Sequence, residues 1–288
     1  MIVPGYHHVE HVMGMAVSID VRDEVEGTPG LTSVLDWLHH VDRTFSTYRE
    51  DSAITRLARG ELLLDEATEE VREVLRRCEA LRGETNGAFD AFAVPAASGS
   101  RLDPSGLVKG WAVEEAARIL EDHAVDNLCI NAGGDVVVRG SPNPAAGGWR
   151  VGVRDPSDPL GLVDLLVVPG PAGVATSGTY ERGAHLIDPA TGEPTTHLAS
   201  VTVIGPDLGS ADAFATAVFV IGERGRAWLA DQPGYDGMLL TRDGRRLTTP
   251  GYDRWRSGRD EPASGCGASA HELRPRCSPP VASREEPT

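Results

Sequence analysis

Residues 128–138 form the run Leu128-Cys129-Ile130-Asn131-Ala132-Gly133-Gly134-Asp135-Val136-Val137-Val138. Its two apolar ends flank a Gly133-Gly134-Asp135 turn, which is the pattern of a β-hairpin. A second hairpin is indicated between residues 238 and 248, where apolar runs flank Asp243-Gly244. Because hairpins join antiparallel strands, the two stretches predict a sheet that is mostly antiparallel.

Helical periodicity alternates with these strands along the chain. Apolar residues recur near every 3.6 positions in four segments, at about 31–41, 71–81, 113–120 and 211–221. We expect the last helix to begin after an N-cap at Ser210. Separate helices combined with hairpins predict an α+β fold of mostly antiparallel sheets with packed helices.

Composition excludes some classes of protein. The chain has 288 residues, with 27 Lys+Arg against 43 Asp+Glu and a formal net charge of −16. A nucleic-acid-binding protein needs a basic face, so this class is disfavoured. No run reaches the ~20 apolar residues of a membrane span, and residues 1–8 lack the features of a secretory leader. These observations predict a cytoplasmic protein without a membrane span.

The two ends of the chain differ from its middle. Residues 258–288 contain only Leu273 and Val281 as large apolar side chains, so we predict a disordered tail that follows a single folded domain, residues 1–257. At the other end, the histidines at positions 7, 8 and 11 near Glu10 indicate a solvated, unanchored polar terminus. The four cysteines form no C-x-x-C pair, so neither a zinc site nor a disulfide framework is expected.

Several common catalytic motifs are missing, including the phosphate-binding G-x-x-x-x-G-K-[ST] loop, H-E-x-x-H and G-x-S-x-G. Small-residue loops with polar groups remain, at Thr85–Asp90 and Asn131–Asp135. Asp103–Gly110 leads into a helix whose N-terminus and Lys109 would favour a phosphate. Taken singly, each of these segments is better explained as an ordinary turn or helix start.

Two further segments carry polar side chains suited to chemistry. Asp212 and Thr216 stand four apart in a predicted helix and therefore share a face, where a carboxylate and a hydroxyl suit a hard cation such as Mg²⁺. The structural alternative is that Asp212 complements the helix dipole and Thr216 packs in the core. His185 and Asp188 place an imidazole and a carboxylate in one short stretch.

Together and in this order, these segments resemble the FAD:protein FMN transferase (ApbE) family. Each motif is weak alone, and the resemblance comes from eight of them in sequence between Met13 and Gly222. The matching segments are Met13-Gly14, Phe45–Tyr48 with Ser52, Gly87–Asp90, Asp103–Gly110, Asn131–Asp135, Ser177-Gly178, His185–Gly192 and Ala211–Thr216.

The resemblance implies a fold and an activity. The fold would be the family's ApbE-like (T-fold-like) architecture. The activity would be a Mg²⁺-dependent transfer of FMN from FAD onto a Ser or Thr hydroxyl of an acceptor flavoprotein, through a phosphoester bond and with release of AMP. Two alternatives stay open, because a metal-dependent FAD pyrophosphatase or a non-catalytic FAD-binding or storage protein would show the same motifs.

The resemblance also implies roles for individual residues. Mg²⁺ would be held by the carbonyl of Gly106 and the side chains of Asp212 and Thr216. His185 is the candidate general base and Asp188 the next candidate, although His185 would equally serve as an anchor for a strand end or a ligand phosphate. The residues that would contact FAD are Met13, Tyr48, Ala88, Phe89, Asp90, Asp103, Lys109 and Ile187.

Overall fold

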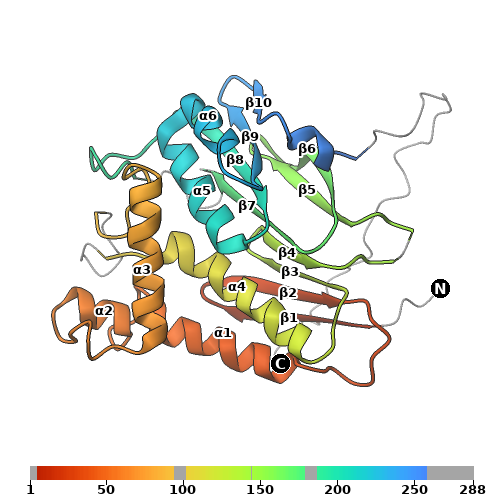
Figure 1. The fold of residues 1–288 in the computed structure, drawn as a ribbon, viewed down its shortest axis with the longest axis horizontal. Coiled ribbons are helices and arrows are strands. Elements are labelled where there is room, and N and C mark those ends of the chain that lie inside the picture. The colour runs from red at the N-terminus through yellow and green to blue at the C-terminus, as the bar shows by residue number, and fades with distance from the viewer. Residues whose placement is uncertain (1–4, 94–101, 144, 179–186, 258–288) are drawn as a thin grey trace, which may run out of the picture. The chain divides into compact units, whose positions relative to one another are not determined.

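A computed structural model describes residues 5–93, 102–143, 145–178 and 187–257 (Figure 1). The predicted tail at 258–288 and the candidate base His185 lie outside the described residues. Within the described part of the chain, no helix is both long enough and apolar enough to cross a membrane.

Two antiparallel sheets confirm the predicted α+β class. The large sheet has eight strands in the order β1-β2-β3-β4-β7-β8-β9-β10, and the small sheet pairs β5 with β6. Both predicted hairpins are present, as β3 with β4 and β9 with β10. The strands are β1 (Tyr6–Val12), β2 (Met15–Val21), β3 (Leu128–Ala132), β4 (Asp135–Arg139), β5 (Trp149–Asp155), β6 (Asp158–Val168), β7 (Ala172–Gly178), β8 (Leu198–Gly205), β9 (Asp236–Thr241) and β10 (Arg246–Thr248).

Helices cover one face of the large sheet (Figure 1). Two of them, α4 and α5, pack against each other, with α4 on β3 and β4 and α5 on β7 and β8. The helices are α1 (Leu31–Phe45), α2 (Ala53–Ala58), α3 (Glu69–Glu84), α4 (Ser105–Asp122), α5 (Leu208–Ile221) and α6 (Gly225–Ala230), with 3₁₀ turns at Gly222–Arg224 and Tyr252–Trp255.

Strand β4 separates two apolar cores. Val137 packs into the core shared with the helices, whereas Val136 and Val138 pack into a second core with β5 and β6. This division follows from the alternation of side chains along a strand. All five residues of β4 are therefore buried, including the charged Asp135 and Arg139 at its two ends.

The prediction of an unanchored histidine-rich terminus is wrong. Residues 6–12 form the edge strand β1, which pairs with β2 along its whole length. The carboxylate of Glu10 contacts the imidazole Nε2 atoms of His8 and His39 at 3.4 and 3.0 Å. Backbone pairing to an apolar neighbour thus orders a segment whose side chains are mostly polar and, apart from Val12, half-buried or exposed.

Two helix starts also differ from the expectation. Helix α5 begins at Leu208, because the side chain of Asp207 accepts the amide N–H of Ser210 at 2.8 Å; Asp207, not Ser210, is the N-cap. Helix α4 begins at Ser105, where the carboxylate of Asp103 accepts the Ser105 amide at 3.0 Å. Gly106 and Lys109 therefore lie within the helix rather than in the loop before it.

Candidate functional site

Several of the motif segments meet at one end of the large sheet. The β1–β2 turn at Met13-Gly14 and the β3–β4 turn at Gly133-Gly134 lie side by side, since the Gly133 amide donates to the Ala16 carbonyl at 3.3 Å. Gly133 and Gly134 both have positive φ, of 58° and 99°, which suits a two-residue hairpin turn. The same end holds the C-terminal end of β7, which runs antiparallel to β4.

A lysine between two buried carboxylates occupies this end of the sheet. The Lys109 Nζ atom on α4 lies 2.6 Å from Asp135 Oδ2 and 3.8 Å from Asp212 Oδ1 on α5. Asp135 is 1% exposed and Asp212 3% exposed. The Asp135 carboxylate also accepts the Thr176 amide at 3.0 Å, which fixes its orientation. The cluster carries two acidic groups against one basic group, so it is electrostatically suited to a further cation.

Asp212 is buried and only partly satisfied by its neighbours. Burial raises the pKa of Asp212; the Lys109 ammonium lowers it and the Asp135 carboxylate raises it. Its Oδ2 atom is buried and accepts no hydrogen bond from the described residues. A buried carboxylate oxygen without a donor is costly, so this atom is available to a ligand that brings positive charge.

A hydroxyl pair and a close helix approach lie beside the carboxylates. The Ser177 Oγ atom at the end of β7 and the Thr216 Oγ1 atom on α5 are 3.2 Å apart. A Cβ atom placed on Gly106 would lie 3.1 Å from the Phe89 ring and 3.8 Å from Thr216 Oγ1. Gly106 therefore brings the α4 backbone close to Thr216, as a shared ligand would require.

The donors in this arrangement are oxygens, which is what Mg²⁺ prefers. Asp212, Thr216 and the Gly106 carbonyl offer oxygen donors that fit such an ion on chemical grounds, and Asp212 Oδ2 is one of the buried polar atoms without a hydrogen-bond partner among the described residues. Among the described residues, no group of three or more His, Cys, Asp or Glu side chains could hold a metal. A metal at this site would therefore depend on one carboxylate supported by neutral oxygens.

The loop that contains Phe89 is tied to the start of α4. The Asp103 amide donates to the Ala91 carbonyl at 2.8 Å, and the Phe89 amide donates to Thr85 Oγ1 at 3.0 Å. The Asp90 carboxylate accepts the Phe92 amide at 2.8 Å and pairs with the Arg82 Nε atom at 3.1 Å. These bonds hold Phe89 buried against Gly106.

The other predicted site residues lie around the cluster or away from it. Met13, in the β1–β2 turn, has a left-handed φ of 55°. Tyr48, after α1, is 81% exposed. Ile187 forms an isolated bridge with Pro194, and the Asp188 carboxylate accepts the Ala190 amide at 2.9 Å, which closes a turn. The structure gives Asp188 a local role and shows no contact between it and the Lys109 cluster among the described residues.

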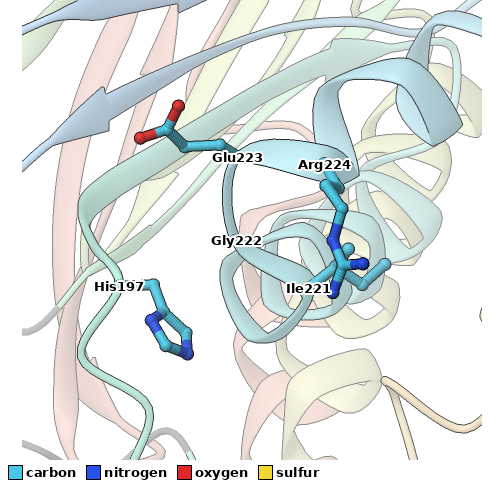
Figure 2. Close-up of a pocket in the computed structure, with 5 residues that line it drawn as sticks. All are labelled: His197, Ile221, Gly222, Glu223 and Arg224. Atoms are coloured by element: carbon cyan, nitrogen blue, oxygen red, sulfur yellow. The ribbon is translucent and has the colours of Figure 1, made fainter.

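A pocket lies at the C-terminal end of α5 (Figure 2). Its lining comes from the residue before β8 and from the end of α5 with the following 3₁₀ turn, namely His197, Ile221, Gly222, Glu223 and Arg224. In the part of the chain that the structure describes, none of the residues predicted for FAD or metal binding lines this pocket. The carboxylate cluster is thus a separate feature.

Two residues of the cluster were missed as site residues. Asp135 was interpreted as part of a glycine turn, and Ser177 belonged to a matching motif segment but received no role at the site. A possible signal was that Asp135 directly follows two glycines at the start of an apolar strand, where a carboxylate has no packing function. Its partner Lys109 is distant in sequence, so the pairing itself left no local trace.

Comparison with known proteins points to one family. The model of the ApbE family matches residues 13–98 and 94–239. The FAD:protein FMN transferase of Treponema pallidum (strain Nichols) is 33% identical over 202 residues, which cover 63% of this chain and 56% of that protein. The FAD:protein FMN transferase of Rhodobacter capsulatus is 31% identical over 223 residues, or 74% of this chain and 38% of that protein. The chain spans about half the length of the curated relatives that it matches.

Solved structures share the fold. The flavin transferase ApbE from Vibrio cholerae superposes with a TM-score of 0.75 at 23% identity, over 87% of this chain and 99% of that one. The ApbE protein from Thermotoga maritima gives a TM-score of 0.76 at 23% identity, over 88% of this chain and 100% of that one. At this identity the similarity concerns the arrangement of helices and strands.

Proposed function

Because the chain belongs to the ApbE family, we propose that it is a magnesium-dependent FAD:protein FMN transferase. In this reaction the hydroxyl oxygen of an acceptor Ser or Thr forms a bond to the FMN phosphorus of FAD. The bond between that phosphorus and the AMP oxygen breaks, and AMP leaves. The hydroxyl proton passes to a base or to water, so charge and atoms balance.

The observation that supports this proposal most directly is the buried Asp212 carboxylate. Its Oδ2 atom has no donor among the described residues. Thr216 follows four positions later on the same helix, and a Cβ atom on Gly106 would lie 3.8 Å from its Oγ1 atom, which supports the assignment of both residues to the same site. We propose that these three residues hold Mg²⁺. When bound, the ion would neutralise charge on the pyrophosphate that otherwise repels the attacking hydroxyl.

The chain's own residues supply binding and orientation. Lys109 presents an ammonium beside the proposed metal ligands, and Asp135 holds that ammonium in place at 2.6 Å. A fixed positive charge near the scissile bond stabilises the charge that develops there without reorganisation. The FAD contacts proposed from the resemblance are Met13, Tyr48, Ala88, Phe89, Asp90, Asp103, Lys109 and Ile187.

The proton acceptor is a separate proposal. His185 is the candidate on the strength of the resemblance and lies outside the described residues. Positioning and charge neutralisation are expected to supply the larger share of the rate, because general-base assistance is typically worth about 10²–10⁴-fold. Asp188 is a weaker candidate, since its carboxylate is engaged in its own turn.

The test uses FAD, Mg²⁺ and a candidate acceptor that carries a Ser/Thr flavinylation segment. We expect the intact mass of the acceptor to rise by one FMN phosphoester and an equal amount of AMP to appear. Asp212→Asn keeps the size of the side chain but removes its charge, so AMP release should fall by about 10²-fold or more. Asp207→Asn is the matched control, because it makes the same change at the N-cap of the same helix, outside the cluster.

Other outcomes separate the competing functions. AMP and free FMN without a modified acceptor would indicate an FAD pyrophosphatase. Tight FAD binding with neither AMP nor a mass change would indicate a storage protein. Full AMP release by Asp212→Asn at the same Mg²⁺ concentration as the unmodified protein would contradict the proposed metal site.

A further inference from the structure

One buried carboxylate outside the proposed site joins three elements. Glu114 lies on α4 and is 4% exposed. Its Oε1 atom accepts a hydrogen bond from Arg139 Nη2 at 2.5 Å, and its Oε2 atom accepts the backbone N–H of Leu208 at 3.1 Å. Arg139 is the last residue of β4 and Leu208 the first residue of α5. The single side chain of Glu114 therefore links α4, β4 and α5, and the three residues Glu114, Arg139 and Leu208 are called the joint below.

The same three elements carry the candidate site. Lys109 precedes Glu114 on α4, Asp135 begins the strand that Arg139 ends, and Asp212 follows Leu208 on α5. Each site residue lies four or five positions from the joint residue on the same element. This distance is about one helical turn in α4 and α5 and the length of the strand in β4. Over so short a distance helices and strands behave as rigid bodies, so a shift at the joint moves the site residues relative to one another.

The two helices approach closely at this joint. A Cβ atom on Gly110 would lie 2.6 Å from the Leu208 carbonyl oxygen, and one on Gly209 would lie 3.2 Å from the Trp111 nitrogen. At Gly110 the three nearest atoms are backbone atoms of Leu208 and Gly209, and at Gly209 the Leu107 side chain lies 3.3 Å away beside the Trp111 backbone. The helices are therefore in close backbone contact next to the bond between Glu114 and the Leu208 amide. The Leu208 N–H is one of the amides that a helix N-terminus leaves without an intrahelical partner.

The Glu114 carboxylate is buried together with the Arg139 guanidinium. Arg139 also donates from Nε to Glu121 Oε1 at 3.0 Å and remains only 6% exposed. A buried ion pair is weak support for stability, because apolar residues of similar volume often replace such a pair without loss. A role in geometry accounts better for a carboxylate whose second oxygen holds the end of another helix.

We propose that Glu114 is a positioning residue, which sets the separation of α4 and α5 through its bond to the Leu208 amide and thereby tunes the affinity of the Asp212–Thr216–Gly106 site for a divalent cation. This inference rests on the proposed function. It assigns no contact between Glu114 and the cation or the substrate.

Two double variants isolate the bond to Leu208. Glu114→Gln/Arg139→Met removes both charges but leaves a carbonyl oxygen to accept the Leu208 N–H, whereas Glu114→Leu/Arg139→Met removes the acceptor as well. Both lack the ion pair, so neither leaves a buried charge uncompensated. The readout is the Kd for Mn²⁺ with protein alone, measured from the free-ion electron paramagnetic resonance signal. We expect a Kd within about threefold of the unmodified protein for the first variant and an increase of about 10-fold for the second, as for other residues that orient metal ligands.

A third variant perturbs the joint without touching its charges. Gly110→Ala places a methyl group against the Leu208 carbonyl, so it should also weaken Mn²⁺ binding while Glu114 and Arg139 stay paired. Circular dichroism at the assay temperature identifies any variant that has not folded, and Gly110→Ala then carries the test in place of Glu114→Leu/Arg139→Met. Equal Mn²⁺ affinity in the folded variants and the unmodified protein overturns the positioning role.

Asp212→Asn separates this inference from the function on which it rests. Loss of Mn²⁺ binding in Asp212→Asn with no effect at the joint refutes only the role of Glu114. Unchanged binding in Asp212→Asn refutes the metal site itself, and the positioning role with it. Weakened Mn²⁺ binding in Asp212→Asn and also in the variants of the joint supports both the metal site and the positioning role of Glu114.

Discussion

Lys109 is the only lysine among the 27 Lys+Arg residues of the chain. Everywhere else a basic position is filled by arginine, whose guanidinium is a broad planar fork. An ammonium is a compact point charge, and at this site it lies between Asp135 and Asp212 at 2.6 and 3.8 Å. The compact ammonium thus lies within 4 Å of both carboxylates at once.

Because Lys109 is the single lysine, an amine-specific reagent can modify the site selectively. Acetic anhydride should acylate Lys109 and the α-amino group, and peptide mapping distinguishes the two. Acylation removes the ammonium charge, so AMP release should fall in parallel with modification of Lys109, and FAD should slow that modification. Lys109→Arg provides the control for the α-amino group. Full AMP release from protein acylated at Lys109 would show that the ammonium is not needed.

At the same scale, the residues of the site were only partly predictable. The four-residue spacing of Asp212 and Thr216 placed them on one helix face, because helix geometry is local. The pairing of Lys109 with Asp135 depends on how α4 crosses β4, which no local pattern records. The same holds for Glu114, whose partners Arg139 and Leu208 are 25 and 94 positions away.

At the scale of elements, helices with strong apolar periodicity were predicted well. Helices α1 and α3 bury the residues that the 3.6 spacing selects, such as Val34 and Leu38 in α1 and Val71 in α3. Strand β1 was missed because its alternate residues are histidines and a glutamate, so apolar alternation is weak. Its order comes from pairing with β2, which is a property of the neighbour and not of the segment.

The cap of α5 gives a prediction at this scale. Asp207→Ala should lower the free energy of unfolding by about 1 kcal/mol, because the first turn loses the acceptor for the Ser210 amide. Ser210→Ala keeps this acceptor and should cost less. Urea unfolding at neutral pH measures both. A larger loss for Ser210→Ala than for Asp207→Ala would contradict the assignment of the N-cap.

The same cap predicts a dependence on pH. Burial acts to raise the pKa of Asp207, but hydrogen bonds from Ser210 and the Arg77 guanidinium outweigh it and lower the pKa. A carboxyl with a lowered pKa stabilises the fold above its unfolded pKa of about 3.9 and loses that contribution as pH falls through the folded value. The stability difference between the unmodified protein and Asp207→Asn should therefore shrink at acid pH. A difference that grows on acidification would refute this assignment.

At the scale of the whole molecule, the last described residues of the chain are bound to the domain by hydrogen bonds and ion pairs. The Ser257 amide donates to the Leu165 carbonyl at 2.9 Å, and the Arg256 Nε atom lies 3.1 Å from Asp164 Oδ2. Asp164 is buried and also contacts Arg246. Residues 246–257 therefore belong to the packed structure of the domain.

Ending the chain after Ser257 should accordingly have little effect. Residues 258–288 contain only Leu273 and Val281 as large apolar side chains. We expect the Tm to change by less than about 2 °C, which corresponds to under about 1 kcal/mol in a protein of this size, and AMP release to stay the same. Calorimetry and the FAD assay on the shortened chain test this. A larger fall in either would show that the tail contributes binding energy to the domain or the site.

The buried charges at both ends of β4 also constrain how the protein folds. Asp135 and Arg139 find their partners, Lys109 and Glu114, on one helix, so a sheet that closed around β4 before α4 arrived would enclose two uncompensated charges. The central strand and α4 should therefore become structured in a single cooperative event. In native-state hydrogen exchange their amides should open together as one unit, while the edge strand β1 exchanges at a lower cost.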